Sequence, residues 1–150
     1  MRGYYGIGVW HPKYGVNIGT LWRSAYTYGA AFLFTVGRRY HKQASDTYKS
    51  WRSIPLWHFD TLDDFFAHTL YSCPLVCVEL ADDAHDLRTF THPERCVYLL
   101  GAEDHGLPEI LMKHRTRLQI PSALPNCLNV ATAGSIILYD RYAKESANGV

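Results

Sequence analysis

The sequence contains no hydrophobic run long enough to cross a membrane. Its longest apolar stretches, such as AAFLFTV at residues 30–36, are far shorter than the about 20 residues of a membrane-spanning helix. The N-terminal segment MRGYYGIGVW lacks the small-residue cleavage site of a signal peptide and leads directly into a strand-and-turn pattern. We therefore expect a cytoplasmic protein that makes no use of a membrane.

The net charge is close to zero, and the sequence has only four cysteines. A net charge of +1 says little about partners, because it produces no strong overall field. Three of the four cysteines lie in or next to apolar, strand-like segments, and a chain of this size needs no disulfides to fold, so we expect free thiols. Cys73 and Cys77 have no second pair to complete a zinc site, and the eight histidines are dispersed. No metal is expected.

No linker, internal repeat or low-complexity segment divides the chain. The seven prolines and 11 glycines are scattered between apolar segments, and 47% of the residues are hydrophobic. That composition is enough for one buried core, and the chain is too short for two ordinary domains. Residues 1–150 are therefore expected to form a single domain.

Several common nucleotide and hydrolase motifs are missing. The segment GIGVWH has two glycines of a dinucleotide-binding fingerprint but His11 in place of the third, and no phosphate-binding Gly-Lys-Ser/Thr loop is present. No serine stands in a G-x-S-x-G turn, and no cysteine is visibly paired with a histidine. These absences argue against a Rossmann dehydrogenase and against serine or cysteine hydrolases.

Positive charge and aromatic rings are concentrated in residues 38–52. This segment contains one acid, Asp46, and five cations: Arg38, Arg39, Lys42, Lys49 and Arg52. Three aromatic rings lie between them in the sequence, those of Tyr40, Tyr48 and Trp51. Cations for phosphates and flat rings for unstacked bases are used to recognise single-stranded or loop RNA. A solvated loop without a ligand explains the composition of this segment equally well.

Strand-like and helix-like segments alternate along the chain. Strands are predicted at residues 4–10, 30–36, 56–59, 75–80, 96–101 and 117–121. Helices are predicted at residues 18–28, 61–71 and 129–143, with shorter helical turns around Leu87 and Phe90 and near Pro108. The alternation predicts an α/β layer structure, in which helices flank a mostly parallel sheet and ligands bind beyond the carboxyl ends of the strands.

The helix boundaries carry their own signals. Asn17 is the predicted N-cap of the first helix and Gly29 its terminating glycine, whereas Asp60 or Thr61 caps the second. Apolar spacing predicts that the second helix turns four side chains inward: Leu62, Phe65, Phe66 and Leu70. The apolar side of the last helix is predicted to consist of Val130, Ala133, Ile136, Ile137 and Tyr139.

Three segments at predicted strand ends together resemble one family. NIGTLWR at residues 17–23 matches an Asn-x-Gly-x-x-x-Arg motif, and LLGAEDHGL at residues 99–107 matches a Gly-x-Glu-x-x-Gly-Leu motif that follows a strand. IPSALPNCLNVA at residues 120–131 is similar to an Ile-Pro loop that ends in Leu-Asn-Val. In this order the motifs resemble those of the SPOUT superfamily of RNA methyltransferases, SpoU/TrmH branch, and the match runs from about residue 6 to residue 142.

The resemblance implies a compact α/β domain with a C-terminal trefoil knot, and S-adenosylmethionine as the methyl donor. It implies transfer to a ribose 2′-hydroxyl of tRNA or rRNA, and we expect tRNA because the chain corresponds to the bare catalytic domain. It also implies a homodimer that pairs through the helix of the first motif and the C-terminal helix. The apolar surface offered for this contact is Trp22, Tyr26, Tyr28, Ile137 and Tyr139.

The resemblance also assigns a cofactor pocket to the loops that follow three strands. Its residues are Glu79, Leu80, Leu100, Gly101, Gly106, Ile120, Cys127 and Leu128. Asn17, Glu103 and Asn129 belong to the same motifs, and we expect them to fix the loops around the site. The sequence departs from the family at Ser122 and Cys127, where Met and Ser are usual, and the loop between them is one residue shorter.

Arg23 is the expected catalytic group. Gly19 lies one helical turn before it, so we expect room for a phosphate or sugar beside the guanidinium. The family is often described with this arginine as a base, but a guanidinium stays protonated in proteins. We therefore expect Arg23 to clamp the adjacent phosphate and polarise the hydroxyl while water takes the proton. A surface arginine in an ion pair is the alternative.

Two other functions stay open from the sequence. The same scaffold can methylate a base, and a chain with this altered third motif can also be a non-catalytic RNA-binding protein. The presence of both Arg23 and Glu103 favours an enzyme.

Overall fold

The computed structural model describes residues 3–69 and 72–149. Its centre is a seven-stranded sheet in the order β3-β2-β1-β6-β4-β7-β5. Each neighbouring strand pair in the described residues is parallel. The strands are β1 (Tyr4–Trp10), β2 (Phe32–Val36), β3 (Leu56–Phe59), β4 (Leu75–Val78), β5 (His85–Asp86), β6 (Arg95–Leu100) and β7 (Thr116–Gln119).

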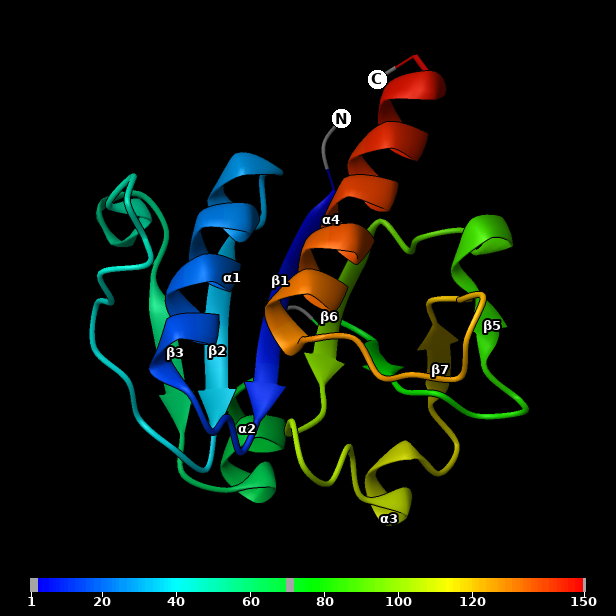
Figure 1. Ribbon diagram of the computed structural model, residues 1–150, viewed down its shortest axis with the longest axis horizontal. Coiled ribbons are helices and arrows are strands. Elements are labelled where there is room, and N and C mark those ends of the chain that lie inside the picture. Colours follow the sequence, from blue (N-terminus) through cyan, green and yellow to red (C-terminus); the bar gives the residue numbers. More distant parts are fainter. Residues whose placement is uncertain (1–2, 70–71, 150) are drawn as a thin grey trace.

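Helices cover both faces of the sheet (Figure 1). Helices α1 (Gly15–Thr27) and α4 (Val130–Ala147) pack side by side and share one apolar core with the sheet. Helices α2 (Leu62–His68) and α3 (Glu109–Met112) contribute Phe65, Leu111 and Met112 to a second core on the opposite face. The described residues also include two single turns of 3₁₀-helix, η1 (Ser50–Arg52) and η3 (Leu87–Thr89). The predicted parallel α/β layer structure is confirmed, and the trefoil knot stays a prediction.

The central strands are buried because both of their faces are covered. All five residues of β2 are buried, which explains its continuous apolar run. In β1, Gly6 and Gly8 lie directly against the rings of Phe32 and Phe34, and a Cβ on either glycine would approach ring carbons to 2.3 and 2.5 Å. The Gly-x-Gly pattern of this strand therefore serves packing between strands.

The ends of α1 were only partly predicted. The helix begins two residues earlier than Asn17, after Tyr14, and Asn17 is buried within its first turn, so the prediction of Asn17 as N-cap is wrong. Its side chain is drawn into hydrogen bonds with other segments instead. Gly29 has a φ of 85° and donates its N–H to the Tyr26 carbonyl, which confirms it as the terminating residue.

The second and last helices also differ in detail from their predictions. Thr61 caps α2 as expected, with its hydroxyl accepting from the Asp64 N–H. Phe66 was predicted to face inward but is 40% exposed, under the guanidinium of Arg115. Leu70 and Tyr71 lie outside the described residues. Helix α4 ends four residues later than predicted. The strand β5 was not predicted, because two residues are too few to show a periodic pattern.

In the part of the chain that the structure describes, no helix has the length and apolarity needed to cross a membrane. The four cysteines are free thiols, as predicted, and of these Cys73, Cys77 and Cys96 are buried.

Candidate active site

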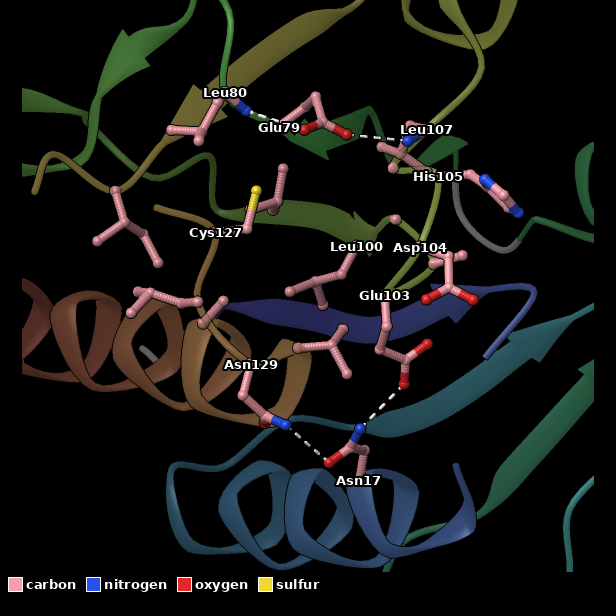
Figure 2. A pocket seen from close by; sticks show the side chains of 18 of the residues that line it. Asn17, Glu79, Leu80, Leu100, Glu103, Asp104, His105, Leu107, Cys127 and Asn129 are labelled. Carbon is pink, nitrogen blue, oxygen red and sulfur yellow. Dashed lines mark hydrogen bonds between the residues drawn. The ribbon is translucent and has the colours of Figure 1, made fainter. Parts of the chain in front are cut away.

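A cavity of about 670 Å³ lies beyond the carboxyl ends of β6, β4 and β7 (Figure 2). These three strands are neighbours in the sheet, so the loops that follow them meet at one edge. The cavity is lined by all eight predicted cofactor residues: Glu79, Leu80, Leu100, Gly101, Gly106, Ile120, Cys127 and Leu128. The structure thus brings together residues that are up to 49 positions apart in the chain, from Glu79 to Leu128.

Glu79 joins two walls of the cavity. One carboxylate oxygen, Oε2, accepts from the Leu107 N–H at 2.9 Å, and Oε1 accepts from the Leu80 N–H at 3.1 Å. Gly106 has a φ of 64°, and a Cβ there would lie 2.3 Å from Glu79 Oε2. Only glycine fits both conditions. The carboxylate therefore shapes the 101–107 loop.

A second network joins the other side of the cavity to α1. Asn17 Nδ2 donates to Glu103 Oε1 at 2.9 Å, and Asn17 Oδ1 accepts from Asn129 Nδ2 at 3.0 Å (Figure 2). Glu103 Oε2 also accepts from the Lys13 N–H at 3.0 Å. Asn17 thus links the loops of the second and third motifs.

Asn129 has two structural tasks. Besides bonding Asn17, its Oδ1 accepts from the N–H groups of Ala131 and Thr132 at 3.0 and 3.2 Å and so caps α4. Helix α4 therefore starts at the cavity wall, and the same side chain fixes both the helix and the loop before it.

The cavity walls combine apolar side chains with a few polar groups. Ile120, Leu128, Val130 and Ala133 supply apolar lining, and the thiol of Cys127 is exposed. Further polar lining comes from residues outside the predicted set: Tyr14, Asp104, His105, Gln119 and Asn126. Their only sequence signal is their place within or beside the three motifs. The mixture suits a flat, partly polar ligand the size of a nucleoside.

Arg23 lies outside the cavity lining. It is exposed on α1, where Nη1 donates to Thr47 Oγ1 at 3.0 Å and the guanidinium carbon lies 4.1 Å from the centroid of the Tyr48 ring. The expectation that Gly19 leaves room for a phosphate is wrong, because a Cβ on Gly19 would lie 2.1 Å from Ser45 Oγ and 2.7 Å from Gln43 Cβ. The missing side chain lets the loop that follows β2 pack onto α1.

The basic segment 38–52 is hydrogen-bonded to the turn that precedes α1. The Tyr40 hydroxyl donates to the Pro12 carbonyl at 2.8 Å, and Arg38 Nη1 donates to the Lys13 carbonyl at 3.0 Å. Lys42 and Arg52 lie over the Trp51 ring, 4.3 and 5.2 Å from its centroid. Arg39 and Lys49 are exposed. The five predicted RNA-binding cations therefore project from one segment that is fixed beside α1.

A parallel sheet with a nucleoside-sized cavity beyond its strand ends is the architecture of α/β proteins that bind nucleotide-like ligands. The chain belongs to the SpoU rRNA Methylase family, whose model matches residues 6–139. No curated protein sequence matches the chain significantly.

Solved structures share the fold. An AdoMet-bound rRNA methyltransferase from Sinorhizobium meliloti is 26% identical, with a TM-score of 0.84 over 96% of this chain and 57% of its own. The TrmH/SpoU tRNA modifying enzyme of A. aeolicus is 17% identical, with a TM-score of 0.85 over 99% of this chain and 78% of its own. A structure concerned with 2-OH methylation of C/U34 on tRNA is 21% identical, with a TM-score of 0.85 over 98% and 99% of the two chains. The chain thus spans little more than half of the Sinorhizobium protein.

Proposed function

We propose that this chain is an S-adenosylmethionine-dependent RNA methyltransferase, in a single domain, that methylates a ribose 2′-hydroxyl of tRNA. The observation that carries the proposal is the convergence of the loops of the second and third motifs on one cavity, with Asn17 of the first motif hydrogen-bonded to both. Membership of the SpoU family and the AdoMet bound in the Sinorhizobium structure support the cofactor.

The cavity fits this cofactor in size and chemistry. Its volume of about 670 Å³ suits a ligand the size of an adenosine with an amino-acid tail. Ile120 and Leu128 offer apolar walls for a ring. Gly101 also lines the cavity, and its bare face packs against the backbone of Gly106 and Leu107, so the 101–107 loop is held close together beside the ligand. When bound, S-adenosylmethionine supplies a methyl group that is already activated on a sulfonium, so the protein needs no covalent intermediate.

The protein's part of the reaction is alignment and exclusion of water. The Asn17 network and the Glu79 carboxylate hold the loops that bind the cofactor. The Arg23 guanidinium clamps an RNA phosphate and polarises the attacking hydroxyl, and water takes the proton. The cations and rings of residues 38–52 hold the rest of the RNA.

The proposed enzyme is a homodimer. Trp22 and Ile137, which were expected in the contact, are 5% and 0% exposed within the chain, so that part of the prediction is wrong. Tyr26 and Tyr139 are 45% and 56% exposed, and the Tyr28 ring lies 5.8 Å from that of Tyr139. A patch of exposed tyrosines on α1 and α4 supports a two-fold contact. Light scattering at micromolar concentration is expected to give twice the monomer mass of 17.1 kDa.

The test combines binding with product analysis. Calorimetry is expected to detect S-adenosylmethionine binding, and the purified protein should transfer labelled methyl groups to tRNA from a strain without this gene. Mass spectrometry of the digested nucleosides is expected to place the methyl on the sugar fragment. A methyl on the base fragment would establish base methylation instead, and absence of cofactor binding at millimolar concentration would refute the enzyme.

A further inference from the structure

Two neighbouring side chains of the basic segment hold Arg23. Thr47 Oγ1 accepts from Nη1 at 3.0 Å, and the Tyr48 ring lies under the guanidinium, with 4.1 Å between the ring centroid and the central carbon. Tyr48 is 65% exposed, and the guanidinium of Arg23 covers one face of its ring. The contact between Arg23 and the Tyr48 ring joins α1 to the segment 38–52.

The backbone that carries Thr47 and Tyr48 is itself fixed. Asp46 is 4% exposed; its N–H donates to the Gln43 carbonyl at 3.1 Å, and its Oδ2 accepts from the Trp51 N–H at 3.2 Å. Ser45 Oγ donates to the Val16 carbonyl of α1 at 2.9 Å, across the bare surface of Gly19. The position of Thr47 and Tyr48 relative to Arg23 is therefore set by packing and not by chance contact.

These contacts order the guanidinium without using it up. Thr47 accepts from one of its five N–H donors, and the Tyr48 ring covers one of its two faces. The other donors and the second face stay available for a phosphate and a base. An arginine that is already ordered loses less rotamer entropy when RNA binds than a freely rotating one.

We infer that Thr47 and Tyr48 are positioning residues for Arg23: they hold its guanidinium in the orientation that grips the RNA phosphate. This inference rests on the proposed function and assigns a role within it to two residues outside the three motifs. It also explains why Gly19 is needed, because any side chain there would push the supporting segment off α1.

The test uses single-turnover methylation and RNA affinity, measured by fluorescence anisotropy, on the full chain. Tyr48→Leu is expected to lower RNA affinity and methylation rate about two- to fivefold, the factor that corresponds to an exposed cation–π contact. Thr47→Val is expected to have a similar effect. Tyr48→Phe and Thr47→Ser keep the ring and the hydroxyl, so they should restore both quantities, while calorimetric cofactor affinity stays constant in all variants.

A double-mutant cycle separates this role from direct stacking of Tyr48 on RNA bases. If Tyr48 acts through Arg23, Tyr48→Leu adds no loss of RNA affinity in the Arg23→Ala background. A further loss of the same size in that background would show that the ring binds RNA itself and would overturn the inference. Phe66→Leu is the matched control, because it removes another exposed ring under an arginine, Arg115, on the opposite face of the sheet.

The remaining outcomes are equally distinct. Unchanged affinity and rate in Tyr48→Leu and Thr47→Val, with an active wild-type protein, would refute the positioning role and leave the proposed function intact. A wild-type protein that binds the cofactor but methylates no RNA would refute the proposed function itself.

Discussion

Gly106 and Glu79 show how a single pair of residues shapes the cavity. The glycine combines a positive φ with a carboxylate oxygen where its Cβ would be, and the carboxylate accepts the next N–H of the loop, from Leu107. The backbone conformation, the available space and the hydrogen bonding at position 106 are therefore all compatible only with glycine.

We expect Gly106→Ala to weaken S-adenosylmethionine binding at least about tenfold, because the added methyl group must displace the Glu79 carboxylate or the loop. Gly149→Ala is the matched control: this glycine also has a positive φ, of 77°, but a Cβ there meets nothing within 4 Å. Calorimetry on both variants measures the effect. Equal cofactor affinity in the two variants would show that the Gly106 loop does not contact the cofactor.

Cys127 offers a chemical probe of the same cavity. Its thiol is exposed, whereas burial raises the pKa of Cys77 and of Cys96 to about 11, so these buried thiols stay protonated and shielded at neutral pH. A thiol reagent at pH 7.5 is expected to modify Cys127 alone in the folded protein and to block cofactor binding. Excess cofactor should slow the reaction, as followed by intact-protein mass spectrometry. Modification at an unchanged rate in saturating cofactor would place the bound ligand away from Cys127.

At the scale of elements, α1 and α4 are connected to the strand-end loops through asparagine side chains. Asn17 of α1 bonds both Glu103 and Asn129, and Asn129 caps α4. Helix packing and cavity geometry are therefore coupled, because the same amides serve both.

Asn129→Ala is expected to lower the free energy of unfolding by about 1–2 kcal/mol through loss of the cap, and also to weaken cofactor binding. Thr61→Ala removes a cap of the same kind from α2, on the other face of the sheet. It should lower stability without changing cofactor affinity. Urea unfolding and calorimetry separate the two effects. If both variants lost cofactor affinity in proportion to stability, the link from Asn129 to the cavity would be wrong.

At the scale of the whole molecule, a buried polar cluster ties the C-terminal helix to the start of β6, away from the cavity. Arg141 is fully buried, and its Nη1 donates to the hydroxyl of Tyr98 at 3.1 Å. His92 bonds that hydroxyl through Nδ1 at 2.6 Å and Asp140 through Nε2 at 2.8 Å. The cluster holds the far end of α4, while Asn129 holds the near end.

Burial lowers the pKa of His92, although the hydrogen bond and charge of Asp140 oppose this shift. Above the unfolded-state pKa of about 6.5, His92 is neutral in both states and the cluster keeps its full stability. As the pH falls below about 6.5, the unfolded chain takes up the proton first, so the free energy of unfolding decreases. Urea unfolding between pH 7.5 and 5 is expected to show this decrease, and His92→Gln should reduce its slope. An identical slope in both proteins would contradict the assignment to His92.

Local patterns in the sequence predicted the order of strands and helices, because side-chain periodicity depends on the nearest neighbours along the chain. The continuous apolar run of β2 and the terminating Gly29 are such cases. The three motifs indicated the loops that line the cavity, since residues after parallel strands meet at one edge of the sheet.

Only the tertiary structure decided which neighbours these residues have across the chain. Trp22 and Ile137 are buried inside the chain, and the segment after β2 packs onto Gly19. Arg23 lies over the Tyr48 ring, outside the cavity wall. Asn17 does not cap its helix as expected; its side chain donates a hydrogen bond to Glu103, 86 residues away. Such contacts depend on how two distant segments dock, and the spacing of residues along the chain does not encode this. The sequence by itself therefore determined the secondary-structure elements and the motif loops. The packing of these elements determined the geometry of the site.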